Sequence, residues 1–141
     1  MGAWDIFPWD NDGAADWFCD MFDRTQLAKH VEDTLQLDPQ NSHEEIRAAA
    51  SILIFLGHPY IWPIHDLDRH LTLAADRLEQ VGRVDVIAES PEFVEQIRAE
   101  VEELRGRINP PGSPRPAPKL PKRKWWTFLN WRDLRNLRKG L

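Results

Sequence analysis

The sequence of residues 48–56 is Ala48-Ala49-Ala50-Ser51-Ile52-Leu53-Ile54-Phe55-Leu56. As an α-helix this stretch is apolar on nearly every side, and a helix of that kind lies in the interior of a protein. It is far shorter than the roughly 20 apolar residues that cross a bilayer. We therefore expect it to be the central, most enclosed helix of an all-α domain.

Both ends of this central helix are marked in the sequence. Ser42-x-x-Glu45 matches a capping box, in which the two side chains satisfy free backbone amides at a helix start. Gly57-His58-Pro59 is expected to stop the helix, because proline cannot continue one. Pro39, ahead of the capping box, is expected to end the preceding helix.

Two helices are expected after the central one. The third helix covers about Asp66 to Val81, followed by Gly82 as a C-cap. Its apolar positions have spacings of 4, 3, 4 and 3: Leu67, Leu71, Ala74, Leu78 and Val81. The fourth helix begins at Ser90-Pro91, with serine as cap and proline in the first turn. Its apolar positions are Phe93, Ile97, Val101, Leu104 and Ile108. The short stretch Val84–Val86 alternates like a strand but cannot form a sheet alone.

The first helix is expected to start near Asp12, whose carboxylate caps free amides, and to run towards Pro39. Its buried face is predicted to consist of Trp17, Met21, Ala28, Val31 and Leu35, widened by Phe18 and Phe22. With the three helices above, this makes a compact four-helix domain of residues 1–108, preceded by an extended N-terminal arm. The segment Tyr60–Ile64 is expected to be an apolar loop over one end of the core.

The N-terminal arm carries a recognisable motif. It contains Met1-Gly2-Ala3-Trp4, Trp9-Asp10-Asn11-Asp12 and Ala15-Asp16-Trp17. These residues resemble the bacterial domain-of-unknown-function family 4259, whose N-terminal pattern is M-G-[AT]-W-G-x-G-x-F-[DE]-N-D-x-A-x-D-[WF]. The positions that agree are Met1, Gly2, Trp4, Asn11, Asp12, Ala15, Asp16 and Trp17, and those that depart are Asp5, Phe7 and Trp9. The resemblance is specific over residues 1–17, extends by helical layout to about residue 108, and implies no activity.

We interpret this motif as structural. Trp4, Phe7 and Trp9 are expected to hold the arm against the bundle, Asn11 and Asp12 to cap the first helix, and Trp17 to lie in its buried face. Replacing Trp4 with alanine is then expected to cost roughly 3–5 kcal/mol, as for a buried aromatic side chain.

Charge divides the chain into two unlike parts. Residues 1–105 contain 22 acidic and 8 basic side chains, a net charge of −14, whereas residues 106–141 contain 1 acidic and 10 basic, a net charge of +9. Such asymmetry indicates an interaction tail, or a tail that folds back on its own body.

The basic part begins with a Pro-rich linker. Residues 109–121 hold six of the 11 prolines and form a semi-rigid spacer that reaches roughly 40 Å. Residues 122–141 follow as a basic, aromatic tail, expected to be an amphipathic helix. Its candidate binding residues are Lys122, Arg123, Lys124, Trp125, Trp126, Trp131, Arg132 and Arg135. Four partners suit this composition: its own body or a second copy, a protein, an anionic membrane surface, and nucleic acid.

The acidic part offers one candidate binding surface. Asp12, Asp16, Asp20 and Asp23 are spaced to share one helical face, which is either a solvated surface or a binding surface for a basic partner. An EF-hand is excluded, because the turn glycine would be Gly13 and the last ligand Cys19. We expect Tyr60 and Trp62 of the neighbouring loop to take part in partner binding.

No catalytic or metal-binding pattern is found. His43, His58, His65 and His70 lack the spacing of metal ligands and are expected on the surface or in loops, and no cofactor is expected. The sequence thus predicts a non-enzymatic interaction protein, an immunity- or inhibitor-like binder of a basic protein. The alternative is a peripheral membrane or nucleic-acid-associated protein recruited through its tail. A cytoplasmic location is expected, with a position at the inner membrane if the tail binds lipid.

Overall fold

The computed structural model describes residue 8 and residues 11–114. Across this part the chain forms six α-helices and no strand, which confirms the predicted all-α class. Trp4 and Trp9 of the arm, and the tail of residues 122–141, lie outside the described residues.

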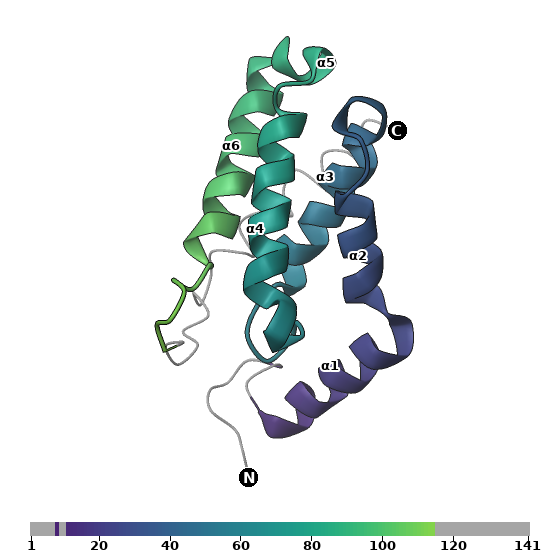
Figure 1. Cartoon of the computed structure of the whole chain (residues 1–141), viewed down its shortest axis with the longest axis vertical. Coiled ribbons are helices and arrows are strands. Elements are labelled where there is room, and N and C mark those ends of the chain that lie inside the picture. Colours follow the sequence, from purple (N-terminus) through teal and green to yellow (C-terminus); the bar gives the residue numbers. More distant parts are fainter. Residues whose placement is uncertain (1–7, 9–10, 115–141) are drawn as a thin grey trace, which may run out of the picture.

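Three helices form the centre of the molecule. Figure 1 shows α4 (Ile64–Val81) between α3 (Pro39–Leu56) and α6 (Pro91–Gly106), with α2 (Leu27–Leu35) beside α3. The predicted apolar positions of α4 are all buried: Leu67, Leu71, Ala74, Leu78 and Val81. In α3 the buried positions are Ile46, Ala49, Ala50, Leu53 and Ile54, which confirms its predicted enclosure.

The predicted first helix is two helices. Gln26 separates α1 (Asp12–Thr25) from α2 and has left-handed backbone angles, with φ 54° and ψ 32°. Its backbone N–H donates to the carbonyl of Phe22 at 2.9 Å, which closes α1. A left-handed residue cannot continue a right-handed helix, so α2 begins in a new direction (Figure 1). The apolar periodicity across residues 17–35 therefore does not belong to one continuous face.

Helix α3 begins earlier than predicted. Asp38 is its N-cap, with a carboxylate that accepts from the backbone N–H of Gln40, and Pro39 is its first residue. The prediction that Pro39 ends the preceding helix was therefore wrong, since proline needs no N–H in a first turn. Ser42 of the predicted capping box lies inside α3 at a kink, with non-helical angles of φ −133° and ψ 31°.

The fourth predicted helix is α6, and it starts as expected. Ser90 is at the N-cap position and Pro91 is the first residue. Ile97, Val101 and Leu104 are buried, whereas the predicted core residue Phe93 is 48% exposed. The stretch that alternates like a strand forms the short helix α5 (Asp85–Ala88).

Arg107 ties the end of α6 to the end of α3. Its Nη1 donates to the carbonyls of Leu53 and Ile54 at 3.1 and 2.8 Å, and its guanidinium pairs with Glu103 at 2.6 Å. The carbonyl of Leu53 also accepts from the backbone N–H of Gly57 at 2.7 Å, so the arginine adds a second donor there and helps to cap the last turn of α3. The N–H of Asn109 then donates to Asp68 at 3.0 Å. Residues 110–114, the first part of the predicted linker, are exposed.

Candidate functional site

Helix α1 presents the predicted acidic face. Asp12, Asp16, Asp20 and Asp23 are all exposed on this one helix. Within the part of the chain that the structure describes, only Asp20 of these four forms an ion pair, with Arg24 at 2.9 Å. Asn11 is the N-cap: its Oδ1 accepts from the N–H of Ala14 at 2.8 Å, as predicted. Asp12 is the first helical residue and makes no cap, although its charge favours the positive end of the helix dipole.

Trp17 lies on the outside of α1. The side chain was predicted to be buried, but it is 62% exposed and packs edge-to-face on Phe18, with ring centroids 5.4 Å apart. The break at Gln26 is the physical reason, because it ends the helical face that would have carried Trp17 into the core. Phe22 is the only side chain of α1 that is buried.

The loop after α3 divides its aromatic residues between core and surface. Trp62 is 2% exposed, so the prediction that it binds a partner is wrong for this structure. Its ring contacts Phe22 of α1 edge-to-face at a centroid distance of 5.0 Å. Tyr60 is 47% exposed, with a left-handed φ of 71°. The loop and α1 are therefore neighbours, as predicted, but only Tyr60 of the predicted pair is accessible.

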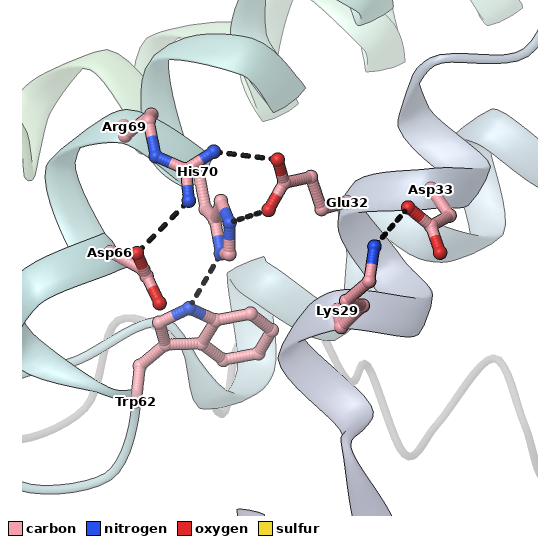
Figure 2. A network of polar contacts seen from close by, with 7 residues as sticks. All are labelled: Lys29, Glu32, Asp33, Trp62, Asp66, Arg69 and His70. Atoms are coloured by element: carbon pink, nitrogen blue, oxygen red, sulfur yellow. Dashed lines mark hydrogen bonds and ion pairs between the residues drawn. The ribbon is translucent and has the colours of Figure 1, made fainter.

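A polar chain runs from Trp62 through the core to α2 (Figure 2). The indole N–H of Trp62 donates to Nδ1 of His70 at 3.0 Å, and Nε2 of His70 lies 2.9 Å from Glu32. Indole nitrogen only donates, so Nδ1 must accept and Nε2 must carry the proton. His70 is thus a neutral imidazole that donates to Glu32. Both ring nitrogens are used within the protein, which makes this chain a brace between α4 and α2.

Arg69 completes this network at the surface. Its guanidinium donates to Glu32 at 2.7 Å and to Asp66 at 2.9 Å. The hydrogen bonds from Arg69 and His70 lower the pKa of Glu32 to about 2. In the same way the hydrogen bonds to Glu32 and Asp66 raise the pKa of Arg69. The carboxyl group of Glu32 therefore remains ionised in the folded protein at all but strongly acidic pH.

His58 is a second buried histidine. It is 3% exposed, and burial together with the positive charge of Arg107 lowers its pKa to about 3. With His70 at 1% exposure, two of the four clustered histidines lie in the core. The prediction of surface or loop histidines was wrong for His70, which is buried within α4, whereas His58 lies in the loop after α3, as predicted, but is buried there. Sequence spacing identified the helix but not which histidine shared its buried face.

An apolar cleft lies between α3, α5 and α6. Its volume is about 590 Å³, and its lining includes Ile54, Phe55, Val86, Ile87 and Phe93. Val86 is 68% exposed and Phe93 is 48% exposed. The sequence analysis missed this cleft, because it forms only where the kinked start of α3 meets the short helix α5.

A buried ion pair forms one wall of this cleft. Glu100, 6% exposed, accepts from Arg47 at 2.9 and 3.2 Å through both carboxylate oxygens. The guanidinium of Arg47 also lies 5.6 Å from the ring centroid of Phe93. The pair joins α3 to α6 and fixes the position of Phe93. The sequence of α6 contains several glutamates and does not indicate that one of them, Glu100, is buried.

Two further properties concern the described residues only. No group of three or more His, Cys, Asp or Glu side chains converges within residues 11–114 in a way that would hold a metal ion. No helix in the same range has the length and hydropathy needed to cross a membrane. The tail candidates Lys122, Arg123, Lys124, Trp125, Trp126, Trp131, Arg132 and Arg135 lie outside the described residues.

The fold and these surfaces define a small all-α protein with an exposed acidic helix, α1, and an apolar cleft between α3, α5 and α6. The family model described as a domain of unknown function, DUF4259, matches residues 2–106, and the chain belongs to this family. The match confirms the resemblance carried by the N-terminal motif and its predicted extent. Comparison with curated proteins and with solved structures gave no match.

Proposed function

We propose that this chain is a non-enzymatic interaction protein whose helix α1 binds a basic protein partner, in the manner of an immunity protein or other inhibitor. The observation that carries the proposal is the side chain of Trp17, 62% exposed on a helix that buries only Phe22. Exposed tryptophan is costly to leave in water and is enriched among the residues that dominate binding energy. Trp17 is thus a natural anchor for a partner.

The charge around Trp17 indicates what kind of partner would fit. Asp16 and Asp20 flank it in the sequence, and α1 contains four aspartates against the single cation Arg24. Among the described residues only Asp20 of these aspartates has an ion-pair partner, Arg24. An aromatic anchor among such carboxylates matches a surface rich in lysine and arginine, because opposite potentials speed encounter and exclude other partners. Tyr60 is exposed on the loop whose Trp62 packs on Phe22 of α1, and we include it in the proposed binding surface.

We place this binding in the bacterial cytoplasm. Cys19 is a free, exposed thiol on the same helix. Exposed free thiols suit a reducing compartment, where they are not driven into disulfides. An inhibitor of a basic toxin or nuclease made in the same cell would act in that compartment.

The test compares three full-length chains as bait for proteins from the source cell. They are the wild type, an α1 variant (Asp16→Asn, Trp17→Ser, Asp20→Asn), and a matched control (Leu37→Ser, Glu95→Gln, Glu102→Gln). The control also loses two exposed carboxylates, both from α6, and one exposed apolar side chain, from the connection between α2 and α3. We expect one basic protein to bind the wild type and the control, with at least about tenfold weaker affinity for the α1 variant.

Two results would contradict the proposal. Equal binding of all three chains would show that α1 is a solvated surface. Capture of nucleic acid or anionic lipid that is released at high salt would instead support recruitment through residues 122–141. A melting temperature for the α1 variant equal to that of the wild type is the control for folding.

A further inference from the structure

Helix α5 lies at the end of the bundle opposite α1 (Figure 1). The cleft extends from α5 and the start of α6 along α3 as far as Phe55. Its exposed floor and rim include Val86 and Phe93, at 68% and 48% exposure. Two neighbouring large apolar side chains that face solvent mark a surface that another group covers. A volume of about 590 Å³ falls within the range of sites that enclose aromatic groups.

The walls of the cleft are held in place before anything binds. Arg47 is fixed by two hydrogen bonds to Glu100 and lies over the ring of Phe93 at 5.6 Å. Its charge is therefore already paired within the protein. Glu44, which also lines the cleft and is exposed, forms no ion pair among the described residues.

The charge around the cleft is negative. The three helices that form it carry eight acidic and three basic side chains, a net charge of −5. The acidic residues are Glu44, Glu45, Asp85, Glu92, Glu95, Glu100, Glu102 and Glu103, and the basic ones are Arg47, Arg98 and Arg105. An apolar cleft in such a field favours an occupant that is both aromatic and basic.

We propose that the occupant is the chain's own segment Lys122-Arg123-Lys124-Trp125-Trp126. This segment joins two aromatic side chains to three consecutive cations, within a region of net charge +9. The paired tryptophans cover Val86 and Phe93, and the lysines lie against Glu44. The cleft thereby holds the tail on the body, at a surface separate from the acidic face of α1.

The chain is long enough to make this contact. The described part ends at Pro114, near the C-terminal end of α6, whereas Phe93 is near its start. Thirteen helical residues separate Phe93 from Gly106, a distance of about 20 Å at 1.5 Å per residue. Trp125 lies 11 positions after Pro114, a reach of about 34 Å in an extended, proline-rich conformation. The segment can thus return along α6 and reach the cleft.

Carbodiimide crosslinking of the full-length chain tests the contact, because it joins lysine amines only to carboxylates that they touch. Wild type is compared with Val86→Lys, which puts a cation and a polar group into the cleft, and with Leu37→Lys, the same change at an exposed apolar position elsewhere. We expect Lys122 or Lys124 to be joined to Glu44 in the wild type and in Leu37→Lys. The yield should fall at least about fivefold in Val86→Lys.

A mixture of ¹⁴N and ¹⁵N chains distinguishes the source of the segment, since a link within one chain carries a single isotope. Links to Asp16 or Asp20 of α1, links only between chains, absence of links, or equal yield in Val86→Lys would each overturn the proposal. The full-length variant Trp125→Ser/Trp126→Ser should lose the crosslink to Glu44. Both substitutions lie in the tail, so the sequence of the helical body is the same as in the wild type. No partner protein is present in this experiment, so its failure leaves the proposal for α1 standing.

Discussion

At the scale of single residues, the exposure of two tryptophan side chains is the opposite of what their sequence neighbours indicate. Trp17 belongs to the family motif and is exposed, whereas Trp62 lies in a proline-flanked loop and is 2% exposed. Trp62 is buried because its one polar atom finds a partner in His70 at 3.0 Å. A buried N–H without such a partner would cost about 1–3 kcal/mol, so the hydrogen bond and the burial depend on each other.

Trp62→Phe should therefore destabilise the protein, by about 2–4 kcal/mol in urea unfolding, through the lost ring area and a buried Nδ1 left without its donor. The same change at Trp17 is the matched control. It should alter the free energy of unfolding by no more than about 0.5 kcal/mol, because that ring is 62% exposed. Similar changes in the free energy of unfolding at both positions would contradict either the exposure of Trp17 or the stabilising role of the hydrogen bond between Trp62 and His70.

At the scale of elements, the helix ends depend on a few backbone positions. Gln26 takes a left-handed conformation between α1 and α2, and Asp38-Pro39 starts α3. Gly57 ends α3, with its N–H donating to the carbonyl of Leu53 at 2.7 Å. The backbone there is so close that a Cβ on Gly57 would collide with the carbonyl oxygen of Leu53. These positions set the directions of the helices, and hence where the cleft and the acidic face lie.

Gly57→Ala should destabilise the protein by about 2 kcal/mol or more, because the collision is with backbone that cannot move without opening the end of α3. Gly106→Ala is the control. Gly106 ends α6, and a Cβ there meets nothing within 4 Å. Alanine at that position should be neutral or stabilising by up to about 1 kcal/mol. Thermal melts of the two single variants against wild type are sufficient, and equal melting temperatures would contradict the close approach at Gly57.

At the scale of the whole molecule, two polar groups link stability to pH: His58, buried in the loop after α3, and Glu32, partly exposed on α2. The pKa of His58 is lowered to about 3, so below its ordinary value of 6.5 the unfolded chain binds a proton that the folded chain does not. The pKa of Glu32 is lowered from 4.5 to about 2, and again the unfolded chain binds the proton first as the pH falls. The contributions of His58 and Glu32 to the free energy of unfolding are complete above pH 6.5, and both are lost as the pH falls.

We expect the free energy of unfolding to fall by roughly 2–4 kcal/mol between pH 7 and pH 3, with the first part, from pH 6.5 to 4.5, due to His58. The share of Glu32 is the smaller one, because its partner Arg69 is 54% exposed and water screens the pair. His58→Gln should flatten the first part, whereas His65→Gln, the same change on the surface, should not. A slope that His58→Gln leaves unchanged would rule out His58 as its source.

Much of the body could be predicted from the sequence because the signals are local. The spacing of Leu67 to Val81 and the pair Ser90-Pro91 both act within a single helix, and both are confirmed. The N-terminal motif likewise identified the family that the chain belongs to. The acidic face of α1 followed from a spacing of about four residues, which one helix preserves wherever it packs.

Tertiary structure alone decided which residues can meet a partner. Trp17 and Trp62 are chemically alike, and only the turn at Gln26 and the hydrogen bond that Trp62 donates to His70 place one outside and the other inside. The cleft depends on three helices that are far apart in the chain, and on the pair between Arg47 and Glu100, 53 residues apart. Helical periodicity shows which residues share a face of one helix, whereas burial depends on how that helix packs against the others. The sequence by itself therefore determined the helices, and their packing determined which surfaces are exposed.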